Sequence, residues 1–234
     1  MNVPPTTPDD LTHPWDITPT EAIALQKRLA SQVIRTNTFD PDSLHTVAGI
    51  DVSLKDQGQA AIVVLSLPDL TVVDRAAFSA PITFPYVPGL LSFRETPLVL
   101  AALKLLKTPP DLLMVDGQGI AHPRRFGIAC HVGLLANIPS IGVGKSVLTG
   151  RYENLGDTPG DQSPLTHRGE TIGIALRAKL RTNPLIISIG HKIDLETAVA
   201  QVQRCLRGYR LPEPTRQAHN YAALAESAPN LTLF

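Results

Sequence analysis

The sequence predicts an α/β domain in which a mixed sheet, antiparallel at first and parallel afterwards, carries helices on both faces. Three apolar runs, 47–54, 60–67 and 71–79, are separated by turns so short that only antiparallel neighbours can be joined. Segments of helix and strand length alternate after them, which is typical of a mixed sheet covered on two sides. At 234 residues, 43% of them hydrophobic, the chain can bury a sizeable core as one domain.

The first helix is expected to begin at a capping box. Thr18 is its N-cap, Pro19 its first residue, and Glu21 lies three residues after the cap. Apolar residues at helical spacing continue to about Ile34. Residues 1–17, rich in Pro, Thr and Asp, are expected to form a loose extension.

The later elements follow from the apolar pattern and the turn residues. In order, we expect a helix at 95–107, a strand at 112–116, a helix at 126–136, strands at 138–143, 171–177 and 185–189, and a helix at 194–207. The polar segment 151–169 is expected to be a loop or lid. The domain is expected to span 18–225, with 226–234 as a C-terminal tail.

Charge is unevenly distributed in a chain whose formal net charge is zero. Residues 124–216 hold 13 Lys and Arg against 7 Asp and Glu, and residues 1–123 hold 8 against 13. This permits a basic face for nucleic acid, although ordinary solvated charge is the simpler explanation. Cys130 and Cys205 have no CxxC partner and read as buried thiols. Without an apolar span or signal sequence, we expect a cytoplasmic protein that does not enter a membrane, and a monomer.

Three carboxylates fall at element boundaries or inside apolar runs. Asp51 lies within VAGIDVS, Asp116 ends the strand LLMVD, and Glu95 stands at the expected start of the second helix. Hydrolysis of a phosphodiester with metal ions needs closely set carboxylates to hold Mg²⁺ or Mn²⁺. If their strands are neighbours, Asp51 and Asp116 meet at one edge of the sheet. The alternative is that Glu95 only complements its helix dipole and Asp116 only caps a turn.

Four further side chains are candidates for contact with a phosphate or a base. Lys145, in GVGKS, offers a point charge after a strand, but Pro139 stands where a phosphate-binding loop requires glycine. His122 and His219 are candidate proton carriers or phosphate contacts, although a lone histidine is more often structural. Tyr86 lies in a loop stiffened by prolines, so its ring would be held ready to enter a base stack. The alternative is a ring packed under the loop.

Five ordered runs resemble the motifs of endonuclease V, the deoxyinosine-specific repair nuclease with a ribonuclease H-like core. They are GIDVS, PYVPGLLSFRE, VDGQGIAHPRRFGIACHVGLL, IPSIGVGKS and GYRLPEPTRQAH. The resemblance extends over roughly residues 20–221. It implies a ribonuclease H-like fold and an enzyme that uses Mg²⁺ or Mn²⁺. It also implies cleavage of the second phosphodiester bond on the 3′ side of the lesion, which leaves a 3′-hydroxyl and a 5′-phosphate.

The resemblance also implies roles for individual residues. The metal-binding and catalytic carboxylates fall on Asp51, Glu95 and Asp116. The basic residues of the catalytic site fall on Lys145, His122 and His219. The tyrosine that separates the strands falls on Tyr86, and the lesion pocket, made largely of backbone groups, falls on Gly89, Leu91, Gly117 and Ile128.

The chain departs from the family pattern at two positions. Many bacterial members read DGHG where this chain reads DGQG, and Gln118 cannot act as an imidazole base or ligand. Gly144 replaces the usual Ala before Lys145. Neither change affects a carboxylate, so an active enzyme is expected.

Two other functions fit the same residues. The first is cleavage of inosine-containing single-stranded RNA, since contacts to a 2′-hydroxyl depend on loop geometry that the sequence does not reveal. The second is a catalytically silent nucleic-acid-binding module. The full carboxylate set argues against such a module, because a binder gains nothing from negative charge where a phosphate must lie.

Overall fold

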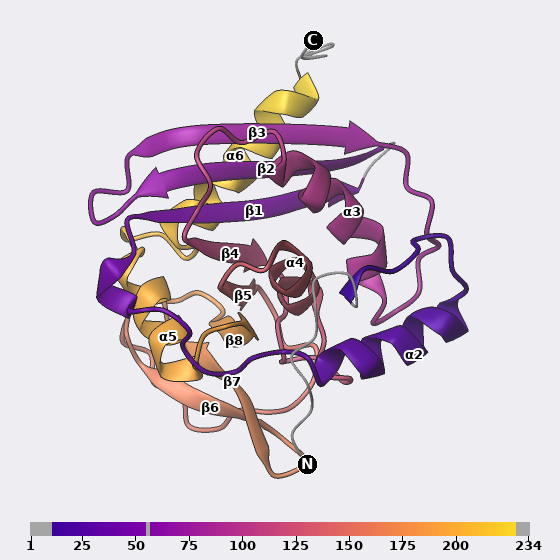
Figure 1. Ribbon diagram of the computed structural model, residues 1–234. Helices are drawn as coiled ribbons and strands as arrows, with labels where there is room; N and C mark the ends of the chain where they lie inside the picture. Colours follow the sequence, from indigo (N-terminus) through magenta and orange to yellow (C-terminus); the bar gives the residue numbers. More distant parts are fainter. Residues whose placement is uncertain (1–10, 55–56, 228–234) are drawn as a thin grey trace.

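An eight-stranded mixed sheet forms the centre of the computed structural model, which describes residues 11–54 and 57–227, without the side chains of 225–227 (Figure 1). Its strand order is β3-β2-β1-β4-β5-β8-β7-β6. The strands are β1 (Thr46–Leu54), β2 (Gly58–Ser66), β3 (Val72–Ala80), β4 (Leu112–Asp116), β5 (Ser140–Gly144), β6 (Gln162–His167), β7 (Glu170–Leu176) and β8 (Leu185–His191). The helices are α2 (Pro19–Ala30), α3 (Leu91–Leu103), α4 (Ile128–Ala136), α5 (Leu195–Arg204) and α6 (Glu213–Ser227), with a 3-10 turn η1 (Pro41–Ser43).

The predicted fold class, a mixed α/β sheet with helices, is confirmed. Strands β1, β2 and β3 are antiparallel, and β1, β4 and β5 are parallel. The expectation that parallel strands continue after β5 is wrong, because β8, β7 and β6 each run antiparallel to their neighbours. Connectivity accounts for two of these three pairs, because short links join β6 to β7 and β7 to β8, and short links require antiparallel pairing.

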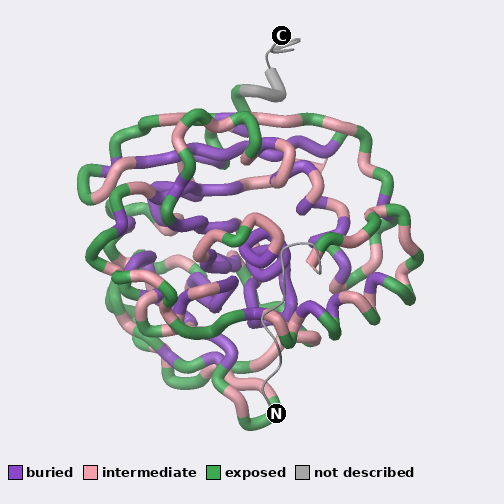
Figure 2. The backbone as a smooth tube through the Cα atoms, in the orientation of Figure 1, coloured by how far each residue is buried: buried purple, intermediate pink, exposed green. Residues whose placement is uncertain are grey.

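The core lies on both faces of the sheet. Strand β2 is buried over eight of its nine residues, whereas only one residue of the outer strand β3 is buried and the others are exposed or half-buried, as Figure 2 shows. Side chains alternate between the faces of a strand. In β1, therefore, Ala48 and Ile50 pack with residues of α3, while Val47 belongs to a separate cluster that includes Ala218 of α6.

Helices α3 and α4 lie in front of the sheet in Figure 1, and α6 passes behind it. Helix α6 packs on β1 and β2. Gly49 of β1 makes this close approach possible, because a Cβ at that position would lie 1.9 Å from the carbonyl oxygen of Pro214. The sequence at this point therefore determines how near α6 comes to the centre of the sheet.

Several boundaries differ from the sequence-based expectation. The capping box at Thr18 is confirmed, but α2 ends at Ala30 rather than near Ile34. Helix α3 begins at Leu91 and not at 95, and it accommodates Pro97 in its interior. Proline is usually tolerated only in the first turn of a helix. The expected loop 151–169 contains β6, an outer strand with Pro164 in it, where a missing N–H is tolerated.

Both ends of the chain differ from expectation where the structure describes them. Residues 13–17 were expected to belong to a loose extension, but His13 Nε2 lies 2.8 Å from His131 Nε2 and Trp15 packs edge-on against Phe93. Residues 1–10 of that extension lie outside the described residues. Helix α6 was not predicted, and it continues to Ser227, into the expected tail; residues 228–234 lie outside the described part. Within the described residues, every helix is too short or too polar to cross a membrane.

Candidate active site

Asp51 and Asp116 lie side by side where the parallel pairing of β1 and β4 ends: Asp116 is the last residue of β4, and Asp51 lies within β1, which continues to Leu54. Strands β1 and β4 pair in the register Val47–Leu112 to Ile50–Val115, and one further step brings Asp51 beside Asp116. Their side chains are only 12% and 11% exposed. The expectation that the two strands are neighbours and that their carboxylates converge at one edge of the sheet is therefore confirmed.

Glu95 approaches the same place from helix α3. It lies in the second turn of this helix rather than in the first, and only 6% of the residue is exposed. The effect of a helix dipole fades beyond the first turn, so simple complementation of the dipole does not explain this residue. Burial of a charged carboxylate at this position costs free energy unless a cation or a hydrogen-bond donor compensates its charge.

Burial and neighbouring negative charge raise the pKa values of Glu95 and Asp116. Burial, followed by the charges of Asp116 and Asp51, raises the pKa of Glu95 to about 8. Burial also raises the pKa of Asp116 to about 6, with a further contribution from Asp51, while the nearby Lys145 acts in the opposite direction. Mutual repulsion of this kind marks a site with excess negative charge.

Two basic side chains contact the aspartates. Lys145, directly after β5, forms an ion pair through Nζ with Oδ2 of Asp116. His219 of α6 places Nδ1 3.0 Å from Oδ2 of Asp51. Over residues 11–54 and 57–227, no group of three or more His, Cys, Asp or Glu side chains is already arranged around a metal position. The three carboxylates thus offer oxygen donors to a metal ion. In this conformation, however, Lys145 already contacts Asp116, and His219 already contacts Asp51.

Lys145 is held in place through its backbone. Arg210, from the loop before α6, donates from Nη2 to the carbonyl of Lys145 at 2.5 Å and from Nε to the carbonyl of Asn183 at 2.8 Å. Sequence reasoning did not single out Arg210, although the run GYRLPEPTRQAH contains it. A half-buried arginine three residues before a helix start carries no pattern that distinguishes it from a solvated charge.

The loop before α3 carries the predicted aromatic wedge. Tyr86 is 73% exposed, so the alternative of a ring packed beneath the loop is wrong. The guanidinium of Arg94, from the first turn of α3, lies 5.6 Å from the centre of the Tyr86 ring. Leu91, the first residue of α3, is 42% exposed beside this loop. An exposed aromatic ring with one cationic neighbour is available to a partner of the protein.

The carbonyl of Gly89 anchors this loop to the domain. It accepts hydrogen bonds from Gln26 Nε2 at 3.0 Å and Arg124 Nη2 at 2.7 Å, and His122 Nε2 lies 3.1 Å away. Gly89 has φ +79°, which a residue with a side chain rarely adopts. Gln26 also donates to the carbonyl of Phe126 at 3.0 Å. Sequence reasoning missed Gln26, because a polar residue on a helix normally faces water.

His122 and the adjacent arginines contact protein groups. Burial lowers the pKa of His122 to about 4, and the charge of Arg124 contributes, so this imidazole is neutral at pH 7. Arg125 pairs with Glu170 at 2.8 Å and donates to the carbonyl of His122 at 2.9 Å. In the conformation described, the two arginines therefore bind groups of their own protein: Arg124 binds the loop around Gly89, and Arg125 binds the start of β7. A proton-carrying role of His122 stays a prediction.

Gly117 and Ile128 lie next to each other. Gly117 follows Asp116, and a Cβ built on it would lie 2.5 Å from Cγ2 of Ile128. Ile128 is the first residue of α4 and is 4% exposed. These two predicted pocket residues are thus brought together beside the carboxylates. Whether they form a pocket with Gly89 and Leu91 stays a prediction.

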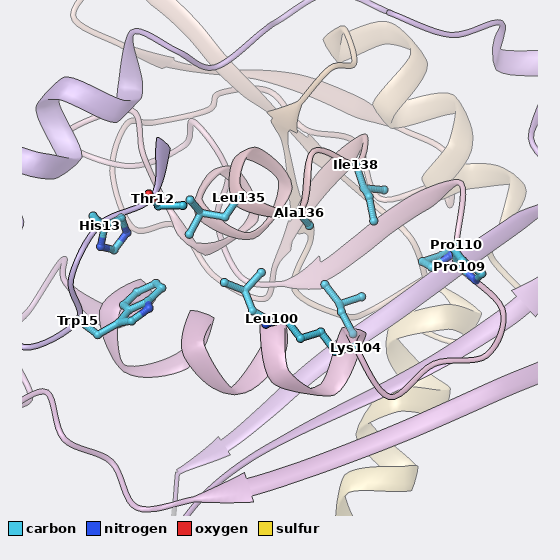
Figure 3. Close-up of a pocket in the computed structure, with 11 residues that line it drawn as sticks. Thr12, His13, Trp15, Leu100, Lys104, Pro109, Pro110, Leu135, Ala136 and Ile138 are labelled. Carbon is cyan, nitrogen blue, oxygen red and sulfur yellow. The ribbon is translucent and has the colours of Figure 1, made fainter. Parts of the chain in front are cut away.

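A cavity of about 410 Å³ lies elsewhere, between the N-terminal segment and the ends of α3 and α4 (Figure 3). Apolar side chains such as Trp15, Leu100 and Leu135 line most of it, and Lys104 reaches its rim. None of the three carboxylates lines this cavity. It therefore does not belong to the acidic site.

Comparisons with known proteins agree with the fold. The family model described as Endonuclease V matches residues 27–220. Endonuclease V from Gloeobacter violaceus is 51% identical over 222 residues, which cover 92% of this chain and 89% of the relative. The crystal structure of endonuclease V from Streptomyces avermitilis is 42% identical, with a TM-score of 0.86 over 91% of this chain and 94% of that one.

A further solved structure contains nucleic acid. It shows Ciona intestinalis endonuclease V in complex with a 24mer DNA that contains an inosine followed by a ribo-adenosine. That protein is 28% identical, with a TM-score of 0.77 over 88% of this chain and 97% of that one. Taken together, the fold, the acidic site and these relatives define an endonuclease of the α/β class. The chain belongs to the endonuclease V family.

Proposed function

We propose that the protein is a metal-dependent DNA repair endonuclease that recognises deoxyinosine. It hydrolyses the second phosphodiester bond 3′ to the lesion and leaves a 3′-hydroxyl and a 5′-phosphate. The observation that carries this proposal is the meeting of Asp51, Glu95 and Asp116 next to Lys145, in a chain whose relative binds inosine-containing DNA.

Asp51, Glu95 and Asp116 would hold the metal ion. Their carboxylate oxygens are the donors that Mg²⁺ prefers, and Mn²⁺ can take its place. The raised pKa values of Glu95 and Asp116, caused first by burial and further by neighbouring carboxylates, support this assignment, because a cation between the carboxylates would offset both effects. When bound, the ion would supply an activated water and neutralise charge on the scissile phosphate.

The two basic neighbours of the aspartates would act on the phosphate and on the proton of the attacking water. Lys145, which already contacts Asp116, would offer its ammonium to a non-bridging phosphate oxygen. His219 would accept or deliver a proton at the imidazole nitrogen that faces away from Asp51, since Nδ1 is engaged with that carboxylate. The half-exposed His219 side chain is accessible for this exchange.

The lesion would be recognised outside the base stack. Tyr86 would enter the duplex as a wedge, and Gly89, Leu91, Gly117 and Ile128 would form the pocket for the flipped base. Unpairing costs least at a mispaired base, which favours a deaminated site over normal DNA. The exposure of Tyr86 and the fixed Gly89 carbonyl support this arrangement.

The direct test is an incubation with a 5′-labelled duplex that carries one deoxyinosine, with Mg²⁺ or with EDTA. We expect a single metal-dependent nick one nucleotide beyond the lesion. Asp51→Ala and Asp116→Ala should abolish it while largely sparing binding, and Asp69→Ala, at an exposed aspartate, serves as the matched control. Nicking that survives either active-site change, or wild-type nicking in EDTA, would contradict the proposal.

Cleavage of inosine-containing RNA is a second candidate, favoured by one observation. The nucleic acid bound by the Ciona relative carries a ribonucleotide directly after the inosine. Competition between matched DNA and RNA oligonucleotides, each with one inosine, separates the two functions. Preferential cleavage of the RNA would shift the proposed substrate to RNA, with the same carboxylates responsible.

A further inference from the structure

The side-chain amide of Gln118 lies directly against Gly144. Gln118 follows β4 and Gly144 ends β5. A Cβ built on Gly144 would lie 2.3 Å from Nε2 of Gln118, 2.8 Å from its Cδ and 3.0 Å from its Oε1. The Gln118 amide therefore occupies the space that the methyl group of an alanine at 144 would fill. The sequence alone does not show that these two residues lie against each other.

The Gln118 amide reaches the segment that carries Lys145. Its Nε2 donates to the carbonyl of Ser146 at 2.8 Å. Arg210 donates to the carbonyl of Lys145 itself. Two successive carbonyls at the end of β5 are thus held by side chains from two other parts of the chain. This backbone positions the ammonium that pairs with Asp116.

The backbone of Gln118 is well anchored, whereas its side chain depends on few contacts. Its carbonyl accepts from the N–H of Ala129 at 3.1 Å, and the next residue, Gly119, donates to Oγ of Ser188 at 2.9 Å. Its Oε1 is buried and has no hydrogen-bond partner among the described residues. The amide is thus held by the bond to Ser146 and by its fit against Gly144, so a methyl group at 144 would displace it.

We propose that Gln118 is a positioning residue for Lys145 and that Gly144 is required because the Gln118 amide needs its space. This inference rests on the proposed role of Lys145 at the phosphate. Gly144→Ala should reproduce the loss of the Gln118 side chain. The two substitutions should therefore not add, because each breaks the same hydrogen bond to Ser146.

The test is a double-mutant cycle on the full chain with Gln118→Ala, Gly144→Ala and the double variant. Single-turnover cleavage of deoxyinosine DNA should fall about tenfold in each single variant, because a displaced reacting group reduces the rate of the chemical step. The double variant should also fall about tenfold, and not about a hundredfold. Affinity for the uncleaved duplex in EDTA should stay within about twofold, since Gln118 acts on the reacting groups and not on binding.

One further variant separates the hydrogen bond from packing, and two others are matched controls. Gln118→Met fills the same space without a donor and should be as slow as Gln118→Ala. Gln217→Ala removes a glutamine whose amide bonds Glu213 in its own helix, and Gly156→Ala introduces a methyl group against the tip of Asp161. Both matched controls should cleave at the wild-type rate.

Three results would overturn the inference: multiplicative effects of the two substitutions on the cleavage rate, a Gly144→Ala variant that cleaves as fast as wild type, or a fully active Gln118→Met variant. The melting temperature supplies a readout that does not depend on cleavage: Gly144→Ala should lower it in the presence of Gln118 and not in the Gln118→Ala background. Failure of the wild type to nick would therefore overturn the proposed function, while equal melting shifts in the two backgrounds would overturn the contact.

Discussion

Replacing Glu95 by glutamine removes one negative charge from a buried group of three carboxylates. The residue is 6% exposed, and its pKa is raised to about 8 by burial and by the charges of Asp116 and Asp51. Glutamine preserves the shape but cannot ionise. We expect Glu95→Gln to stabilise the metal-free protein at alkaline pH and to abolish cleavage, because the proposed metal ligand is lost together with the charge.

The magnitude follows from proton linkage. A carboxyl group with a folded pKa of about 8 and an ordinary value of 4.5 binds its proton more tightly in the folded state. Its contribution to stability is therefore fully present below pH 4.5 and is lost as pH rises through 8. The full difference is on the order of 5 kcal/mol. Water and relaxation around the carboxylates reduce the expected gain of Glu95→Gln to roughly 2–4 kcal/mol at alkaline pH.

The assay is urea unfolding in EDTA at about pH 5 and about pH 8.5. The variant should be more stable than wild type at the higher pH, and the difference should shrink at the lower pH, where most Glu95 is protonated. Glu153→Gln, at a side chain that is 69% exposed, is the matched control and should show no such pH dependence. Mg²⁺ at the higher pH should stabilise wild type more than Glu95→Gln, because only a ligand that binds the folded state shifts unfolding. Equal pH slopes for Glu95→Gln and wild type would refute the argument.

Three other predictions concern the loop before α3 and the buried histidines. Tyr86→Ala should weaken binding of lesion DNA by about 1–3 kcal/mol, the typical value of one stacked base, and should leave the melting temperature unchanged because the ring is exposed. Fluorescence anisotropy in EDTA measures the affinity, and an unchanged affinity would argue against a wedge. Gln26→Leu should lower the free energy of unfolding, measured in urea, by about 1–3 kcal/mol, because the substitution removes the hydrogen bonds from the Gln26 amide to the carbonyls of Gly89 and Phe126. An unchanged free energy of unfolding would show that water replaces the amide. Stability should also fall as pH drops from about 6.5 towards 4, because burial lowers the pKa values of His122 and His191 to about 4, so these two imidazoles gain protons in this range only in the unfolded chain. Their effect outweighs that of Asp116, whose pKa of about 6 lets the folded chain gain one proton in the same range; a flat unfolding profile over this range would contradict the prediction.

The sheet edge that carries the aspartates could be predicted because its signals are local. Asp51 and Asp116 follow apolar runs whose length and flanking turns mark strands, and parallel neighbours bring equivalent ends together. The capping box of α2 is likewise formed within four adjacent residues. In each case the pattern and the structural outcome lie within one element or one pair of strands.

The parts that could not be predicted depend on contacts between distant segments. Helix α6 has a polar sequence, and its position follows from the fit of Pro214 against Gly49, a contact between opposite ends of the chain. The basic pair Arg124 and Arg125 looks free in sequence, yet both side chains are engaged by Gly89, Gln26 and Glu170. A charge count cannot distinguish a guanidinium that binds its own protein from one that is available to phosphate.

The acidic site draws on both faces of the sheet and lies where β4 ends beside β1. Glu95 comes from α3 in front of the sheet and His219 from α6 behind it, whereas the two aspartates belong to the sheet itself. Side chains from opposite faces can approach each other beside Asp116, because β4 ends there and its backbone no longer separates the two faces, although β1 continues to Leu54. The parallel pairing of β1 with β4 places two carboxylates at that edge. The close approach of α6 at Gly49 then allows His219 to reach Asp51, so the geometry of the site depends on this helix contact as much as on the strands.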